Sequence, residues 1–337
     1  MRILLIGGTG LLGAEGARQL IAHGHQVRAV ALPPLPAGLE LPPEMELIFG
    51  NYLAFSDAEI RGLMQGCEGF IFAAGVDERV EGQPPIYSLF EKYNITPLRR
   101  LLTLARECGI RHVVVLGSYF SYFAQLWPDR RLYEDHPYIR SRVDQEKMAL
   151  SFASDSMAVA VLQLPYIFGA QPGRKPVWVF LVEMIRGMKG ATFYPKGGSA
   201  MVTVRQVGQG MTGALEHNQG GRAYPIGFYN LTWVELLKIF HKYLGLPGKP
   251  VVTIPTGLFA LSCWLIRRKQ LKKGFEGGLN LVKFARTMAT NLFIDRQTAA
   301  DDLGIEEDDL DAAIGDSVRV SLALIQSKEQ AVDMRGE

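Results

Sequence analysis

Two side chains that could do chemistry together stand four positions apart in the segment "YIRSRVDQE" (138–146). Pro137 suits the first turn of a helix, so Tyr138 and Arg142 would point the same way from one helix face. An ordinary phenol has a pKa of about 10, and a fixed cation beside it favours the phenolate. The spacing fits either an active-site tyrosine or a helix surface on which Arg142 and Glu146 form a solvated pair.

The overall composition is that of an ordinary globular protein. The 337 residues are 48% hydrophobic and 21% charged, and a chain of this length has about two domains as a soft prior. The net charge of +2 gives no electrostatic reason to expect nucleic acid as the main partner. The longest apolar stretch beyond the N-terminus, 257–266, is much shorter than the ~20 residues that span a bilayer.

The cysteines and histidines do not indicate a metal site or a disulfide framework. Cys67, Cys108 and Cys263 form no CxxC motif, and the six histidines show no HxxxH or HxxE spacing. The opening "MRILLIGG" lacks the features of a secretory signal. We therefore expect a cytoplasmic protein without a metal.

The elements that would position a site are clearest near the N-terminus. A continuous apolar run at 2–7 has the length of a buried strand, and 26–32 predicts a second strand. Between them, the spacing of small and apolar residues at 11–24 predicts a helix. The loop "GGTGLLG" (7–13) therefore lies inside a β-α-β unit, which is the context that a dinucleotide site requires.

The glycine spacing in this loop has a physical reason. A pyrophosphate binds the free N–H groups of a helix N-terminus, with a favourable dipole. Side chains at Gly7 and Gly10 would hold the phosphates away, and one at Gly13 would push the helix off the sheet. A tight turn without a ligand is the alternative, and the β-α-β context argues against it.

This loop resembles the Gly-rich loop of the short-chain dehydrogenase/reductase superfamily. The chain length and later motifs resemble its extended branch, the NAD-dependent epimerase/dehydratase family, over most of 1–315. The resemblance implies that NAD or NADP is bound by the loop residues Gly7, Gly8, Thr9, Gly10, Leu11, Leu12 and Gly13. It further implies contacts from Asn51 and Tyr52 near the adenine, from Ala73, Ala74 and Gly75 after a strand, from Asn94, and from Pro165, Tyr166 and Ile167 beside the nicotinamide.

In this family a Tyr-x-x-x-Lys motif occupies the place of Tyr138 and Arg142. The resemblance makes Tyr138 the acid or base in hydride transfer, while the lysine lowers its pKa and binds the nicotinamide ribose. Arg142 can supply the cation, and its planar fork can hold two ribose hydroxyls. It cannot release a proton at working pH, so a relay through an ammonium group is lost.

The family also supplies a serine or threonine that holds the substrate oxygen. Ser118 is the nearest match, Tyr119 takes its place if the alignment slips by one, and Ser121 is within reach. A serine that caps its own loop is an equally good interpretation. Two further positions depart from the family, since relatives usually have aspartate at Asn51 and often at Gln206.

The choice between NAD and NADP depends on the end of the second strand. An acidic residue there binds the ribose 2′-hydroxyl of NAD, and an arginine binds the 2′-phosphate of NADP. This chain has Ala31 and Leu32, with Arg28 earlier on the strand and Glu40 beyond a proline-rich loop. The absence of a placed arginine favours NAD.

The expected fold is α/β, a doubly wound parallel sheet of the Rossmann type with a smaller, interleaved C-terminal substrate domain. We assign 1–166 plus 200–230 to the dinucleotide-binding domain and 167–199 plus 231–337 to the substrate domain.

The predicted function is that of an NAD(P)-dependent oxidoreductase or epimerase/dehydratase. Its substrate would be a small molecule, either a nucleotide sugar or another hydroxyl or carbonyl compound. The departures at Arg142, Asn51 and Gln206 motivate an alternative, a non-catalytic dinucleotide-binding regulator or assembly protein. The helix at 87–109 is a candidate homodimer interface. The segment 264–273 combines apolar residues with five cations, for which a solvated face is favoured over a membrane surface.

Overall fold

The computed structural model describes residues 1–35 and 37–327. Seven parallel strands form its central sheet in the order β11-β7-β6-β4-β1-β2-β3. Their bounds are β1 (Arg2–Ile6), β2 (Gln26–Ala31), β3 (Glu46–Phe49), β4 (Gly69–Phe72), β6 (His112–Leu116), β7 (Ala158–Gln163) and β11 (Gly221–Pro225). The chain changes direction across the sheet between β1 and β4, which is where doubly wound sheets bind ligands. The predicted Rossmann fold is confirmed.

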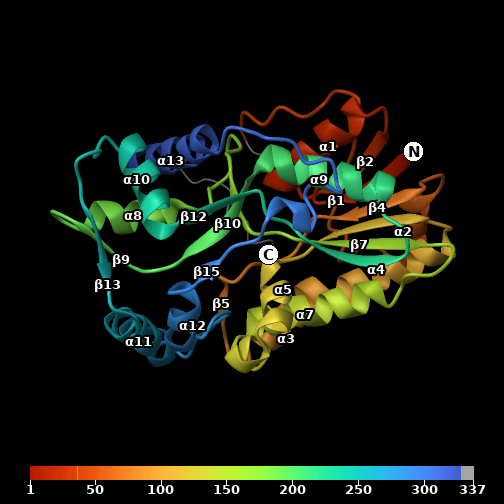
Figure 1. Cartoon of the computed structure of the whole chain (residues 1–337). Coiled ribbons are helices and arrows are strands. Elements are labelled where there is room, and N and C mark those ends of the chain that lie inside the picture. Colours follow the sequence, from red (N-terminus) through yellow and green to blue (C-terminus); the bar gives the residue numbers. More distant parts are fainter. Residues whose placement is uncertain (36, 328–337) are drawn as a thin grey trace.

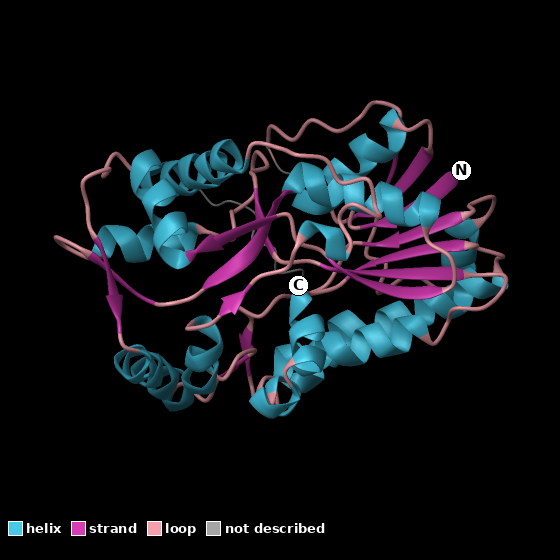
Figure 2. Ribbon diagram, viewed as in Figure 1, coloured by secondary structure: helices cyan, strands magenta, loops and turns pink. Residues whose placement is uncertain are grey.

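Helices cover both faces of this sheet (Figures 1 and 2). On β1, Ile3 and Leu5 pack on one side while Leu4 and Ile6 pack on the other, because strand side chains alternate. One face carries α1 (Leu11–Ala22) and α9 (Val204–His217), and the other carries α2 (Asp57–Met64), α4 (Thr96–Glu107) and α7 (Pro137–Leu150). Burial on both faces explains why these strands read as unbroken apolar runs.

The helical pattern predicted over 87–109 is divided in the structure. It consists of α3 (Tyr87–Phe90), a π-helical turn (Glu91–Ile95) and α4, with Pro97 in the first turn of α4. The loop predicted after the fifth strand contains a helix, α5 (Tyr119–Leu126), followed by a 3₁₀ turn (Pro128–Arg130) and α6 (Leu132–Asp135).

The remaining elements form a second region beside the carboxyl edge of the sheet. Its largest sheet has the order β12-β10-β15, with β8 also paired to β10, and two small sheets pair β13 with β9 and β14 with β5. The strands are β5 (Glu81–Gly82), β8 (Tyr166–Phe168), β9 (Thr192–Pro195), β10 (Gly198–Thr203), β12 (Tyr229–Thr232), β13 (Val251–Ile254), β14 (Glu276–Gly277) and β15 (Asn291–Leu292). The helices are α8 (Val179–Gly187), α10 (Trp233–Tyr243), α11 (Thr256–Lys272), α12 (Leu281–Met288) and α13 (Leu310–Ser327), with a 3₁₀ turn at Arg296–Thr298.

This region has its own aromatic core. The ring of Phe168 stacks on that of Trp178 with centroids 4.4 Å apart, and Trp233 and Phe240 are buried nearby. The proposed domain boundaries remain a prediction, and residues 328–337 of the second domain lie outside the described part of the chain. Within the described ranges, no helix is both long and apolar enough to cross a membrane.

Candidate active site

The glycine-rich loop has a backbone that only glycine permits. Gly7 has φ of 92°, and a Cβ there would lie 2.6 Å from the carbonyl oxygen of Ala73. A Cβ at Gly13 would collide with the backbone of Gly7, so the first turn of α1 lies directly on the loop. Gly10 is the N-cap of α1 and no side chain caps this end. The first-turn N–H groups are therefore available, and the cradle fits a dinucleotide pyrophosphate.

Two side chains that the sequence analysis missed contact this loop. Gln171 Nε2 and Arg174 Nε donate to the carbonyl oxygen of Thr9 at 2.9 and 3.0 Å. Arg174 also reaches the Thr9 hydroxyl at 3.3 Å. They come from the segment between β8 and α8, far away in sequence, so no local motif indicates them. They place one guanidinium beside the phosphate cradle.

The segment after β4 is held by Asn94. Asn94 Oδ1 accepts from Val76 N at 2.8 Å, and Asn94 Nδ2 donates to Val76 O at 3.0 Å. A Cβ at Gly75 would lie 2.6 Å from Asn94 Oδ1, and Gly75 has φ of 135°. Gly75 and Val76 therefore run close past the π-helical turn. This close approach explains the glycine at position 75, and Ala73 lies instead against Gly7 of the glycine-rich loop.

The residues predicted near the adenine lie at the end of β3. Asn51 Oδ1 accepts from Leu53 N at 3.0 Å, so the amide closes a turn. The ring of Tyr52 meets Phe72 edge-on at 6.1 Å, and burial raises the pKa of Tyr52 to about 12. The turn gives Asn51 a local structural role.

Tyr138 and Arg142 lie together on α7, buried at 4% and 9% exposure. Arg142 Nε donates to the Tyr138 hydroxyl oxygen at 3.1 Å. The surface-pair interpretation of Arg142 and Glu146 is wrong, because Glu146 is buried and its carboxylate accepts instead from Gln125 Nε2 at 3.0 Å and Gln163 Nε2 at 2.8 Å.

A buried amide completes the surroundings of the guanidinium. Arg142 Nη1 donates to Gln145 Oε1 at 2.8 Å, and Gln145 Nε2 donates to Asn94 O at 2.7 Å. Gln145 thus links Arg142 of α7 to the π-helical turn. The spacing of three residues indicates that Arg142 and Gln145 are neighbours, but the contact with Asn94 depends on the tertiary fold.

The direction of these hydrogen bonds fixes where the tyrosine proton can go. A guanidinium only donates, so the Tyr138 oxygen is the acceptor toward Arg142. The Tyr138 O–H is left to donate elsewhere. Burial raises the pKa of Tyr138, Arg142 opposes this, and the Glu78 carboxylate adds to it.

Glu78 is a second ionisable group near the tyrosine that the sequence analysis missed. It follows β4 in the same segment as Gly75 and is half-buried. Burial and the neighbouring Asp77 carboxylate raise the pKa of Glu78 to about 7, against Arg79 and Arg142, which lower it. Its charge therefore changes near neutral pH.

The three candidates for the substrate-oxygen ligand have different surroundings. Ser118 is the N-cap of α5, and its Oγ accepts from Phe120 N at 3.4 Å. The Tyr119 hydroxyl lies 3.0 Å from Ser199 Oγ. Ser121 is buried beside the Glu146 carboxylate. The loop-capping geometry of Ser118 is present, and its contact with a substrate remains a prediction.

The segment predicted beside the nicotinamide begins at Pro165, directly after β7 and Leu164. Tyr166 contacts the rings of Tyr119, Trp178 and Trp233 at centroid distances of 6.1, 5.2 and 5.5 Å. Ile167 O accepts from Trp178 Nε1 at 2.9 Å. This segment therefore joins the carboxyl edge of the sheet to the aromatic core of the second region.

Two of the noted residues have structural partners away from Tyr138. Arg28 pairs with Glu46 at 3.0 Å and donates to Leu63 O at 2.7 Å. Gln206 forms a capping box with Thr203 at the start of α9 and donates to Glu306 O at 2.8 Å. Capping boxes use Glu or Gln at this position, which gives Gln206 a role in folding.

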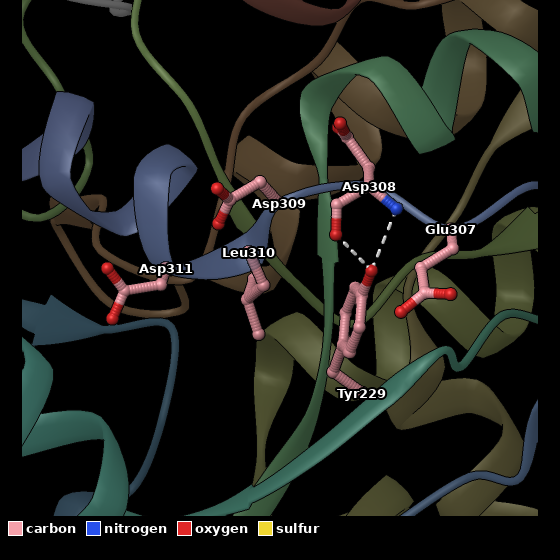
Figure 3. Close-up of a pocket in the computed structure, with 6 residues that line it drawn as sticks. All are labelled: Tyr229, Glu307, Asp308, Asp309, Leu310 and Asp311. Carbon is pink, nitrogen blue, oxygen red and sulfur yellow. Dashed lines mark hydrogen bonds between the residues drawn. The ribbon is translucent and has the colours of Figure 1, made fainter.

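A separate open hollow of about 640 Å³ lies at the start of α13 (Figure 3). It is lined by Tyr229, Glu307, Asp308, Asp309, Leu310 and Asp311. The Tyr229 hydroxyl accepts from Asp308 N at 2.8 Å and donates to Asp308 O. Asp308 Oδ2 accepts from Thr203 Oγ1 at 2.6 Å. These bonds fasten the segment before α13 to β10 and β12, and none of the lining residues belongs to the tyrosine site.

The fold and the site together define a Rossmann-type dinucleotide-binding protein with a buried tyrosine–cation pair beside the cofactor crevice. The chain belongs to the NAD dependent epimerase/dehydratase family, whose sequence profile matches residues 3–227. This family is NAD(P)-dependent and comprises enzymes, which confirms the cofactor class and the enzyme class predicted from sequence.

Individual relatives are distant in sequence. A Synechocystis protein named "Putative dihydroflavonol 4-reductase" is 23% identical over 334 residues, covering 93% of this chain and 92% of its own. The Bacillus cereus UDP-glucuronic acid 4-epimerase, solved with UDP-glucuronic acid and NAD, has a TM-score of 0.68 at 14% identity, covering 96% of this chain and 100% of its own. A nucleoside-diphosphate-sugar epimerase from Pseudomonas aeruginosa has a TM-score of 0.66 at 17% identity, covering 95% and 96%. These structures share the fold.

Proposed function

We propose that the protein transfers hydride between NAD and a secondary hydroxyl or carbonyl carbon of a small molecule, with Tyr138 as the acid/base. The observation that carries this is the hydrogen bond from Arg142 Nε to the Tyr138 oxygen. Because the guanidinium cannot accept a proton, the phenolic O–H is left to donate to a substrate oxygen, as a catalytic acid requires.

The residues have distinct tasks in this proposal. In reduction, Tyr138 donates its proton to the substrate oxygen, and the charge left on the phenolate is stabilised by the fixed guanidinium of Arg142. In oxidation, the phenolate accepts the hydroxyl proton. The nicotinamide, when bound, accepts or supplies the hydride. Ser118 would hold the substrate oxygen, and the glycine loop with Arg174 would hold the dinucleotide phosphates.

A substrate of the nucleotide-sugar class is the one we favour. The support is the fold shared with enzymes solved with UDP-sugars and NAD. Aromatic rings line the surroundings of the tyrosine, since Phe120 lies edge-on to Tyr138 with ring centroids 6.4 Å apart and Tyr119 joins Phe120 to Tyr166. A net reductase acting on another carbonyl compound is the second candidate, supported by the reductase-named relative. We also propose NAD over NADP, because Arg28 is committed to Glu46 and Leu63.

Comparing the wild type with Tyr138→Phe tests the catalytic assignment. We expect turnover to fall by roughly 10²–10⁴-fold, the usual contribution of a positioned acid or base. NAD affinity, measured by calorimetry, should be nearly unchanged. Product stereochemistry with UDP-sugars separates epimerisation from net redox chemistry, which nicotinamide absorbance reports. Unchanged turnover in the variant would remove Tyr138 from the reaction.

The non-catalytic alternative makes a different prediction about the same helix. A regulator that only binds the dinucleotide would show NAD binding without turnover, and Arg142→Lys could then create an activity that the natural protein lacks. A homodimer through the helix at 87–109 also remains a proposal. The exposed residues of α4 are all polar or charged: Thr96, Arg99, Thr103, Arg106 and Glu107.

A further inference from the structure

Helix α11 presents leucines to solvent. Leu258, Leu261 and Leu265 are 54, 54 and 51% exposed, and their spacing of three and four residues places them on one stripe of the helix. The opposite stripe of α11 packs against the rest of the protein. Cys263 is buried there, and Arg267 Nη1 donates to Asn280 Oδ1 at 2.7 Å. The outward stripe of α11 is therefore apolar along the first two-thirds of the helix, where a surface helix is expected to be polar.

Basic side chains follow the leucines toward the C-terminal end of the same exposed stripe. Arg268 and Lys272 extend the spacing of Leu261 and Leu265, and Lys269 and Lys273 flank them. All four are exposed, and none forms an ion pair within the described residues. The sequence from 256 to 275 has no aspartate or glutamate. The stripe that carries the leucines is thus apolar first and cationic afterwards.

Further apolar side chains widen this surface. Trp264, Ile266 and Leu271 are 44, 50 and 56% exposed. The guanidinium of Arg268 lies 5.3 Å from the centre of the Trp264 ring, where the apolar and cationic parts meet. Tryptophan and arginine are side chains that favour the boundary between lipid headgroups and acyl chains. Exposed apolar patches of this kind mark protein or membrane contacts.

The positive charge of α11 favours a lipid surface over a second copy of the chain as the binding partner. In a two-fold pairing, each α11 would meet the same surface of its partner, so the four cations would meet either the partner's cations or its leucines, and in neither arrangement an acidic side chain of α11. An anionic bilayer instead offers negative headgroups to the cations and an apolar boundary to the leucines. The sequence favours a solvated face for residues 264–273. The exposure of Leu258, Leu261 and Leu265 favours a lipid surface instead.

We propose that α11 attaches the protein to the surface of anionic bilayers, with its leucine stripe inserted at the headgroup boundary and its cations on the lipid phosphates. The helix lies beside α12, at the end of the molecule away from β1 and β2 (Figure 1). This inference does not depend on the proposed function.

Vesicle flotation of the full-length protein tests the proposal. The vesicles are pure phosphatidylcholine or contain 30% phosphatidylserine, about the regime in which cations near the surface contribute measurably. We expect binding only to the anionic vesicles, weakened by added salt. Leu258→Ser/Leu261→Ser/Leu265→Ser should abolish it, and Arg268→Glu/Lys272→Glu should lower it by roughly tenfold or more.

A matched charge reversal outside α11 provides the control. Arg99 and Lys238 are exposed on α4 and α10, so Arg99→Glu/Lys238→Glu changes the net charge equally and should keep binding close to the wild type. Circular dichroism and thermal unfolding check that each variant is folded. The proposal is wrong if the wild type stays unbound with anionic vesicles, or if the control loses binding equally. It is also wrong if light scattering shows a dimer that the leucine variant dissociates, because the occupant is then a second copy.

Discussion

The phenolic oxygen of Tyr138 accepts a hydrogen bond from Arg142 Nε at 3.1 Å, and Arg142 Nη1 donates at 2.8 Å to Gln145. A lysine ammonium at position 142 would have to reach both partners from one nitrogen atom, whereas the guanidinium donates to them from two separate nitrogens of its rigid fork. The arginine therefore belongs to a buried hydrogen-bond network whose geometry fits a guanidinium. It is more than a substitute for a lysine.

Arg142→Lys should lower an existing activity by roughly tenfold to a hundredfold, the cost of one charge-assisted hydrogen bond of about 1.5–3 kcal/mol. A lysine cannot hold the Tyr138 oxygen and Gln145 in the same planar arrangement. The measurement is kcat and KM, with a substrate that the wild type turns over in the assays with UDP-sugars described above. A rise in activity from nothing would instead support the non-catalytic alternative.

Gln145→Leu should destabilise the fold by about 2–4 kcal/mol, because it leaves a buried guanidinium N–H without its acceptor and removes the hydrogen bond to the Asn94 carbonyl. Gln145→Glu should have a smaller effect, since it still accepts from Arg142 but cannot donate to Asn94. Urea unfolding measures both. Gln19→Leu, at a partly buried amide on α1, is the control and should change stability much less. Equal stability of Gln145→Leu and the wild type would show that the hydrogen bonds of Gln145 to Arg142 and Asn94 do not stabilise the fold.

Glu78→Gln should move the alkaline ionisation of Tyr138 to lower pH. Above its pKa of about 7, Glu78 is negative and raises the pKa of Tyr138. Removing that charge favours the phenolate and eliminates the inflection near neutral pH. The pH profile of kcat/KM for substrate oxidation is the readout. Glu134→Gln, at an exposed carboxylate on α6, should leave the profile unchanged; an identical shift in both variants would contradict a local effect of Glu78.

His136 should make the protein less stable in acid. Burial lowers the pKa of His136 to about 4, below the ordinary value of 6.5. Between these values the unfolded chain binds a proton that the folded chain does not, so stability falls as the pH drops from 6.5 to 4, by up to about 3 kcal/mol. His136→Asn can keep an acceptor for Asn280 N, which His136 Nδ1 binds at 3.1 Å. The urea midpoint should fall less steeply with decreasing pH in the variant than in the wild type. An equal slope would show that another group causes the acid sensitivity.

The parts of the site that depend on local sequence could be predicted. The loop from Gly7 to Gly13 follows from a strand, a close turn and a helix that are consecutive in the chain. Tyr138 and Arg142 are neighbours because one helical turn separates them. The sheet order follows from the same succession of strands and helices, since right-handed crossovers leave few alternatives.

The remaining contacts depend on packing between distant segments. Gln145 reaches Asn94 only because a π-helical turn precedes Pro97, and Arg174 reaches Thr9 only because the segment after β8 folds back over the sheet. Gln206 departs from the family pattern in sequence, yet its partners are a helix cap and Glu306 O. Residue type alone could not separate that structural role from a catalytic one.

The first turn of α7 is bonded to the second region, because Tyr138 N donates to Gly278 O at 2.9 Å and Asn280 N donates to His136. A chimaera that exchanged the C-terminal region with that of a relative would replace these partners along with the substrate pocket. Grafting a new specificity onto this protein therefore requires residues 278–280 to be kept or redesigned, or Tyr138, the proposed acid/base, will be displaced.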